Sequence, residues 1–219
     1  MTDNNTLQYT KESPITRILL VRHGETAWNR EHRFQGRSNT LLNEKGREES
    51  RALAYALKDE TITAAYSSPL GRALETVKLI IHHHPSVRIL EEKDFVEMDL
   101  GTFEGMEAQF WVSHYPEFLE RWRDTPSSVN MPGGESLEEV QTRAVNALKR
   151  IVSQHPPGST LLICSHNFVI LTILCHAMNI HLDDFRKIKQ STTALNILCK
   201  QGENLWAEVV NDRSHLELI

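Results

Sequence analysis

Short, unbroken apolar runs alternate along the chain with longer segments in which apolar residues recur at helical spacing. The runs predict strands at residues 17–22, 64–67, 87–90, 160–164, 195–199 and 205–210. The longer segments predict helices at residues 43–58, 68–84, 136–154 and 167–178. Strands that alternate with helices indicate an α/β layered sheet. The hairpin formed by the last two strands predicts an antiparallel edge on a mostly parallel sheet.

Two of these helices carry recognisable start signals. Ser136 and Glu139 form a capping box, in which each side chain accepts a hydrogen bond from the backbone N–H of the other. Ser68 and Pro69 are expected to be the N-cap and the first residue of the helix that follows strand 64–67. This second signal places Arg72 in the first helical turn, where it points back toward the strand ends.

The composition is that of an ordinary globular protein. The 219 residues are 40% hydrophobic and 24% charged, and the net charge is −5. A chain of this length can fold without disulfides or a metal, and a negative chain without a basic tract is not expected to bind nucleic acid or an anionic membrane. Cys164, Cys175 and Cys199 stand in apolar segments without CxxC spacing. Because no segment suits a signal peptide or a membrane span, the sequence predicts a cytoplasmic protein with reduced cysteines.

The chain is expected to form a flexible arm at residues 1–14 and a single domain at residues 15–219. One segment, residues 103–134, stands apart as an excursion between the two halves of the sheet. Its first part, residues 103–122, contains six of the 15 aromatic residues. Two interpretations are open: the aromatic side chains form local core beneath a long crossover, or the segment acts as a lid over an active site.

Polar residues stand directly at the ends of three of the predicted strands. Arg22 and His23 end the first strand, Ser165 and His166 end the fourth, and Arg72 follows the second. Because ligands bind beyond the carboxyl ends of strands in open α/β sheets, these groups are expected to converge on one crevice. Two arginines and the starts of two helices suit a small, doubly charged anion such as a phosphate group.

The histidines of this crevice suggest the chemistry. An unperturbed imidazole is largely neutral at pH 7, and neighbouring cations lower its pKa further. A neutral imidazole nitrogen flanked by Arg22 and Arg72 can attack phosphorus, because these cations neutralise the phosphoryl oxygens. No metal or other cofactor is expected, since the arginines and histidines supply the positive charge that Mg²⁺ supplies elsewhere.

The segment from Leu20 to Thr26, followed by Trp28 and Asn29, resembles the signature of the histidine phosphatase superfamily, the phosphoglycerate-mutase-like proteins. Further motifs follow in the family's order at residues 33–36 (RFQG), 67–76 (SSPLGRALET), 97–101 (EMDLG), 104–105 (EG), 133–136 (GGES) and 165–166 (SH). The resemblance covers nearly the whole chain from residue 17 onward. It implies a three-layer α/β/α sandwich around a mostly parallel mixed sheet, in agreement with the pattern of strands and helices.

The resemblance implies a role for each of five catalytic residues. His23 matches the nucleophile that becomes phosphohistidine. Arg22, Arg72 and His166 match the rest of the phosphate pocket. Glu97 matches the carboxyl group that protonates the leaving oxygen and later activates water.

Other residues near these motifs are less clearly assigned. Asp99 and Glu104 stay open as alternatives to Glu97 for the acid. The resemblance also implies that Asn29, Gln35 and Gly36 line the phosphoryl site.

Asn167 is counted among the phosphate-binding residues, although it stands where the family usually has glycine. Asn tolerates left-handed backbone angles better than most residues do, so the phosphate-binding turn after His166 is expected to survive. Asn39 and Leu41 depart from the family's common Asp and Pro, which affects only the detail of that loop.

The excursion favours a phosphatase over a mutase. Residues 104–134 contain Arg121 and Arg123 against five carboxylates, a charge balance that would repel a bisphosphate and suits a monophosphate ester with a neutral or apolar leaving group. The sequence therefore predicts a metal-independent phosphomonoesterase of the histidine acid phosphatase type, acting on a small-molecule phosphate monoester. A phosphoglycerate mutase-type transferase and a non-catalytic phosphate-binding module are the alternatives. The oligomeric state, a homodimer included, stays open.

Overall fold

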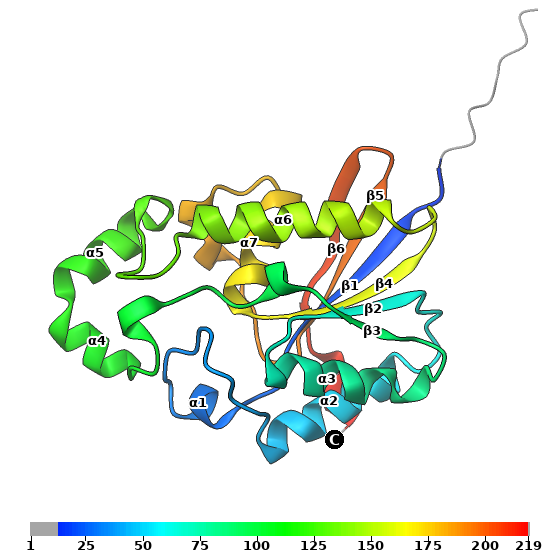
Figure 1. The fold of residues 1–219 in the computed structure, drawn as a ribbon, viewed down its shortest axis with the longest axis horizontal. Coiled ribbons are helices and arrows are strands. Elements are labelled where there is room, and N and C mark those ends of the chain that lie inside the picture. The colour runs from blue at the N-terminus through cyan, green and yellow to red at the C-terminus, as the bar shows by residue number, and fades with distance from the viewer. Residues whose placement is uncertain (1–12, 219) are drawn as a thin grey trace, which may run out of the picture.

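A single six-stranded mixed sheet forms the centre of the computed structural model, which describes residues 13–218 (Figure 1). Its strands are β1 (Thr16–Arg22), β2 (Ala64–Ser67), β3 (Ile89–Glu91), β4 (Thr160–Ser165), β5 (Leu195–Gln201) and β6 (Asn204–Asp212). Their order is β3-β2-β4-β1-β5-β6. The first four strands of this order pair in parallel, and β5 and β6 are antiparallel. The predicted mostly parallel sheet with an antiparallel edge is confirmed.

Helices cover both faces of the sheet, as Figure 1 shows. They are α2 (Glu44–Ala56) and α3 (Gly71–Ile80) on one face, and α6 (Leu137–Ser153) and α7 (Asn167–Ala177) on the other. Alternate residues of β1 point to opposite faces: Ile18 and Leu20 pack in the core cluster of α6 and α7, whereas Leu19 and Val21 pack in that of α2 and α3. This double burial explains the unbroken apolar run of β1, and it makes the fold the expected three-layer sandwich.

The excursion forms two short helices, α4 (Ala108–His114) and α5 (Pro116–Asp124), which lie together to one side of the sheet (Figure 1). Phe103, Trp111 and Trp122 belong to the main core cluster. Phe110 and Tyr115 are exposed. Part of the aromatic content is therefore core, as the first of the two interpretations held, and a lid function stays a prediction.

The remaining elements are short. They are helix α1 (Ala27–Arg30) and 3₁₀ turns at Ile81–His83, Lys93–Phe95, Gly101–Phe103, Pro126–Ser128, Leu182–Lys187 and Ser214–Leu218. The helix expected at residues 68–84 thus ends as a 3₁₀ turn. The strand expected at residues 87–90 begins instead at Ile89.

The predicted start of α3 is wrong. The helix begins at Gly71, and Leu70 precedes it without a capping side chain. The side-chain oxygen of Asn39 accepts a hydrogen bond from the Gly71 N–H at 2.6 Å and so caps the helix from a distant loop. Ser68 instead accepts from the Leu70 N–H, which starts the turn into the helix. The cap is tertiary, so the local sequence could not reveal it.

Three further features bear on the sequence analysis: the arm, the cysteines and the lengths of the helices. The arm expected at residues 1–14 lies outside the described residues, apart from its last two. The three cysteines are free and buried, as predicted. In the described part of the chain, every helix is too short or too polar to cross a bilayer.

The capping box of α6 provides a test of the helix assignment. Ser136 Oγ accepts from the Glu139 N–H at 3.1 Å, and Glu139 accepts from the Ser136 N–H at 2.8 Å. Ser136→Ala removes one of these bonds, so we expect the free energy of unfolding to fall by about 1 kcal/mol. Urea denaturation measures this loss. Ser136→Thr, which keeps the hydroxyl, should stay within a few tenths of a kcal/mol of the parent, and an equal loss in both variants would contradict the capping assignment.

Candidate active site

Neighbouring parallel strands bring the predicted catalytic residues together. Arg22 ends β1, in register with Ser165 at the end of β4, and the N–H of His23 donates to the Ser165 carbonyl at 3.0 Å. His166 follows Ser165, and its ring lies 5.1 Å from that of His23. Arg72 lies in the first turn of α3, the helix that follows β2. Although β4 separates β2 from β1, Arg72 Nε reaches His23 and donates to its ring. The polar residues therefore converge, as expected, at the carboxyl ends of β1, β2 and β4.

A close contact of two glycines holds the end of β1 against α2. A Cβ atom on Gly24 would lie 2.5 Å from the carbonyl oxygen of Gly46, and a Cβ on Gly46 would collide with the backbone of Glu25. Any side chain at either position would push α2 away from the strand end. Glycine after His23 is thus required by packing rather than by an unusual backbone angle.

The hydrogen bonds of His23 determine which ring nitrogen is free. Its Nδ1 lies 2.7 Å from the Gly24 carbonyl oxygen, which can only accept, so Nδ1 carries the proton. Nε2 then has the lone pair, and Arg72 Nε donates to it at 3.2 Å. His23 is 3% exposed. The ring is oriented as a nucleophile, with Nε2 directed at the cationic side of the site.

Arg72 is fully buried and is held mainly by backbone oxygens. Its Nη1 donates to the Ser38 carbonyl and its Nη2 to the Gly36 carbonyl, both at 2.7 Å. We assign the Gln35 amide so that its oxygen faces the guanidinium, 2.6 Å from Arg72 Nε, where it shares the single Nε–H with His23 Nε2. Burial lowers the pKa of Arg72 to about 10, so the side chain stays cationic at neutral pH. Gln35 and Gly36 therefore hold the arginine of the predicted phosphate pocket.

The two alternative acids are engaged away from the histidines. Glu104 accepts from the backbone N–H groups of three consecutive residues, Gly36, Arg37 and Ser38, at 2.9 to 3.1 Å. Asp99 accepts from the Gly101 N–H at 2.9 Å, and its other oxygen pairs with Arg37 at 3.2 Å. Glu104 thus shapes the loop whose carbonyl groups hold Arg72.

The Glu97 carboxyl group lies buried against the first turn of α7, the helix that begins directly after His166. Its carboxyl group accepts from the Met98 N–H at 2.9 Å and from the Phe168 N–H at 3.1 Å. Burial raises the pKa of Glu97 above its ordinary value, although these N–H groups and the charges of Arg72 and Arg22 act in the opposite direction. A carboxyl group in this state can stay protonated at higher pH than usual, as a general acid requires.

Two buried donors of the site have no protein partner within residues 13–218. Ser68 Oγ lies 2.7 Å from His166 Nε2, the one acceptor that the structure offers its hydroxyl hydrogen, which assigns the His166 proton to Nδ1. That Nδ1 and the Nε of Arg22 are both buried without a hydrogen bond. An unsatisfied buried donor costs about 1–3 kcal/mol. A bound phosphate group, which offers only acceptors, fits these donors.

The histidines are held in the neutral state. Burial, followed by the charges of Arg72 and Arg22, holds the pKa of His23 well below its ordinary 6.5. Burial, Arg72, His23 and Arg22 do the same for the pKa of His166. Both rings therefore stay uncharged at neutral pH.

Two predicted phosphate-site residues have structural contacts of their own. Asn29 Oδ1 accepts from the backbone N–H of Thr26, and Thr26 Oγ1 accepts from the Asn29 N–H, which makes a capping box at the start of α1. Asn167 is the first residue of α7 and has no left-handed backbone angle. The expectation that this position needs left-handed geometry is wrong, because the chain enters the helix directly after His166.

One supporting segment gave no signal in the sequence. Arg22 Nη1 donates to the Gln190 carbonyl at 2.6 Å, and the His23 carbonyl accepts from the Thr193 N–H at 3.2 Å. Thr193 adopts a φ of 53°, which is strained for a β-branched residue, and its hydroxyl donates to the buried Glu49 at 2.9 Å. The contacts to Arg22 and His23 use backbone atoms of residues 190–193, so the side chains do not reveal them.

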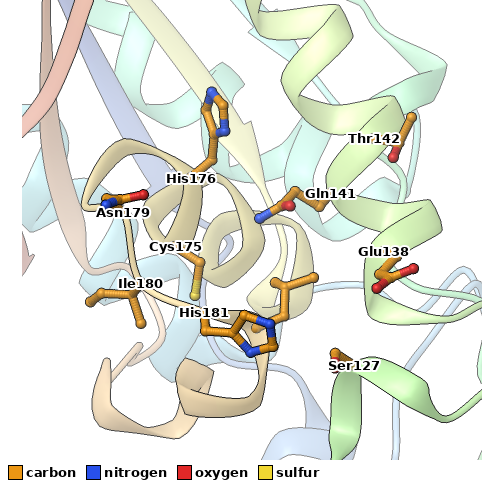
Figure 2. A pocket seen from close by; sticks show the side chains of 10 residues that line it. Ser127, Glu138, Gln141, Thr142, Cys175, His176, Asn179, Ile180 and His181 are labelled. Carbon is orange, nitrogen blue, oxygen red and sulfur yellow. The ribbon is translucent and has the colours of Figure 1, made fainter.

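A large hollow lies elsewhere on the molecule. A cavity of about 540 Å³ opens between α6, the end of α7 and the turn that follows it (Figure 2). Glu138, Gln141, His176 and His181 are among the side chains that line it, and none of the predicted site residues does. Among the described residues, His, Cys, Asp and Glu side chains form no cluster of three that could hold a metal ion.

Comparisons with known proteins agree with the geometry. A family model described as the histidine phosphatase superfamily (branch 1) matches residues 18–213, which include every predicted site residue. The chain is 33% identical to phosphoglycerate mutase-like protein 4 of Arabidopsis thaliana, over 91% of this chain and 86% of that protein. It is 32% identical to phosphoserine phosphatase 1 of Hydrogenobacter thermophilus, over 78% of this chain and 80% of that protein. The solved structure of YhfR from Bacillus stearothermophilus matches with a TM-score of 0.86 at 31% identity, covering 92% of this chain and 99% of that one.

The neutral histidines make a prediction for NMR. We expect His23 and His166 to gain a proton only well below pH 6.5. In Arg72→Gln the pKa of His23 should rise toward 6.5, because one of the cations that oppose protonation is gone. Arg33→Gln, which changes a half-exposed arginine outside the pocket, should leave it unchanged. Imidazole ¹⁵N shifts followed through a pH titration measure these values. An unaltered His23 pKa in Arg72→Gln would show that Arg72 does not keep the ring neutral.

Proposed function

The chain belongs to branch 1 of the histidine phosphatase superfamily, and we propose that it is a metal-independent phosphomonoesterase that works through a phosphohistidine at His23. The observation that carries this proposal is the His23 ring, whose Nε2 lone pair faces Arg72 while Nδ1 is anchored to a carbonyl. The unsatisfied donors of Arg22 and His166 supply the matching contacts for a phosphate group.

The first step transfers the phosphoryl group to the enzyme. His23 Nε2 attacks phosphorus, and the bond between phosphorus and the ester oxygen breaks. Arg22 and Arg72 neutralise the charge on the phosphoryl oxygens, and the Nδ1–H of His166 donates a hydrogen bond to one of them. The departing oxygen takes the proton of the Glu97 carboxyl group and leaves as an alcohol.

The second step returns the enzyme to its starting state. The Glu97 carboxylate, now without its proton, removes a proton from a water molecule. The resulting hydroxide attacks phosphorus, and the bond between phosphorus and His23 Nε2 breaks. Inorganic phosphate leaves and Glu97 is protonated again, so the two steps balance without a metal ion or another reactant.

The segment next to the site favours a substrate with one phosphate group. Residues 104–134 contain five carboxylates, and Arg123, one of the two cations there, pairs with Asp124 at 2.8 Å. A mutase of the family must hold a second anionic group, which this segment would repel. We therefore rank hydrolysis of a small phosphate monoester above phosphoglycerate mutase-type transfer, although relatives with mutase names are as similar as the phosphatases. The aromatic side chains of the segment suit a neutral or apolar leaving group.

The covalent step can be tested directly. His23→Ala should lose at least about 10³-fold in turnover of p-nitrophenyl phosphate, since no other group can accept the phosphoryl group. Rapid acid or base quench of the parent with ³²P-labelled substrate should trap a phosphoenzyme that is labile in acid and stable in base. All assays contain excess EDTA. Full activity in His23→Ala, or activity that EDTA abolishes and Mg²⁺ restores, would contradict the proposal. A panel that includes phosphoserine and 3-phosphoglycerate then ranks the substrates.

The acid role of Glu97 makes a second prediction. Alkyl phosphates leave as poor alkoxides, whereas p-nitrophenolate leaves without a proton, so Glu97→Gln should slow phosphoenzyme formation from an alkyl ester by about 10²–10⁴-fold and far less from the p-nitrophenyl ester. In the parent, the alkyl rate should fall as pH rises through the raised pKa of Glu97, because the acid loses its proton there. Glu97→Gln should lack this decline. Single-turnover rates across pH measure both effects, and equal rates for parent and variant on both esters would transfer the acid role to Asp99 or Glu104.

A further inference from the structure

The loop that carries Glu97 is held by one arginine from a distant helix. Arg143, in the second turn of α6, uses all five N–H groups of its guanidinium. Nη1 donates to the carbonyl groups of Asp94 at 2.6 Å and Val96 at 2.7 Å, and Nη2 donates to that of Glu97 at 3.2 Å. The Glu135 carboxylate accepts from Nε at 2.9 Å and from Nη2 at 3.0 Å. A lysine, with one nitrogen, could not reach all of these acceptors.

Glu135 fastens the same loop on the far side of Glu97. Its Oε2 accepts from the Asp99 N–H at 2.9 Å, and its own N–H donates to the Asp99 carbonyl at 2.9 Å. Although burial alone would raise the pKa of Glu135, the hydrogen bonds from Arg143 and Asp99 lower it, so the carboxylate stays charged. The loop is thereby held by hydrogen bonds to its carbonyl groups up to and including that of Glu97, and by a hydrogen bond from the Asp99 N–H beyond it.

The loop has no regular structure that would hold it otherwise. Residues 96–100 belong to no helix or strand, so their backbone groups lack the partners that such elements provide. On the inner side, Ser165 Oγ donates to the Phe95 carbonyl at 2.8 Å, which ties the loop to the strand end next to His166. Arg143 provides the corresponding hydrogen bonds from α6.

We propose that Arg143, together with Glu135, is a positioning residue that keeps the Glu97 carboxyl group at the leaving oxygen. The inference rests on the acid role proposed above for Glu97. A general acid must lie within hydrogen-bond reach of the atom that it protonates, and a displacement of about 1 Å can cost on the order of 10²-fold in rate. Because Arg143 bonds the carbonyl of Glu97 itself, its loss would shift the carboxyl group without removing it.

The same helix provides a matched control. Arg150, two turns after Arg143, pairs with the carboxylates of Glu92 at 2.6 Å and Asp94 at 3.4 Å. It carries the same charge to the same loop, but these contacts involve side chains and not the backbone next to Glu97. Arg150→Ala therefore reproduces the loss of charge and of an ion pair, and it leaves in place the hydrogen bonds that Arg143 donates to the loop backbone.

The first experiment measures single-turnover phosphoenzyme formation, so that dephosphorylation does not contribute. Arg143→Ala should slow this step with an alkyl phosphate on the order of 10–100-fold, and with p-nitrophenyl phosphate by less than about 3-fold, because only the alkyl ester needs the proton. Arg150→Ala should stay within about 2-fold of the parent on both esters. Equal losses on the two esters in Arg143→Ala, or no loss on either, would overturn the proposal.

The second experiment asks whether Arg143 acts through Glu97. In a Glu97→Gln background, adding Arg143→Ala should produce no further selective loss on the alkyl ester, since the group that it positions is already absent. A full additional loss would overturn the positioning role. If Glu97→Gln alone is unselective, the acid assignment fails. If Glu97→Gln is selective and Arg143→Ala is not, only the positioning role fails.

A third measurement separates positioning from folding. The Arg143 side chain is 16% exposed and borders an open surface depression with Glu139 and Asn146, so a small cation can reach its place. Guanidinium ion at millimolar concentration should restore part of the alkyl ester rate in Arg143→Ala and leave Arg150→Ala unchanged. If Arg143→Ala does not fold, Arg143→Lys takes its place, with a smaller selective loss expected. Absence of both rescue and selectivity in a folded variant would overturn the proposal.

Discussion

The burial of the Arg72 guanidinium beside His23 is the constraint on which the rest of the site depends. Arg72 is completely inaccessible, and its terminal nitrogens donate to backbone carbonyl oxygens rather than to carboxylates. A carboxylate in that place would neutralise the charge that the proposed phosphate binding requires. Carbonyl oxygens satisfy the donors and leave the charge intact, which keeps the pocket positive while its cost of desolvation is partly offset. The loop at residues 36–38 must therefore hold its carbonyl groups in place.

Two loops of the site are each held by a charged side chain from another segment, one acidic and one basic. The Glu104 carboxylate gathers the N–H groups of residues 36–38, and the carbonyl groups of this loop then hold Arg72. The Arg143 guanidinium donates to the carbonyl groups of residues 94, 96 and 97, and this loop carries Glu97. Neither loop has regular secondary structure throughout, so a charged side chain from elsewhere supplies the missing backbone partners. Each of these side chains thus holds the loop next to one of the residues proposed for the reaction.

Burial also reconciles two opposite requirements of the chemistry. In the proposed reaction the nucleophile must be an uncharged base and the acid must be an uncharged acid, and removal from water favours the uncharged form of both. It lowers the pKa of His23 and raises the pKa of Glu97. The arginines reinforce the first shift and oppose the second. The balance at Glu97 therefore depends on how deeply its carboxyl group is buried, which the loop position determines.

The sequence by itself determined the sheet type and most of the helices, and it singled out the residues that the fold brings together at the strand ends. The patterns that predicted them are local: an unbroken apolar run, a capping box and polar groups at strand ends. The physical cause of each lies within the segment itself. Only the tertiary structure decided what these residues contact. Asn39 caps α3 from a distant loop, Glu104 orders the loop around Arg72, and Arg143 holds the backbone at Glu97. These are bonds between a side chain and a backbone group far away in the chain. Because every residue offers the same backbone N–H and carbonyl, no local pattern marks which one is bound, and only the packing of the elements selects it.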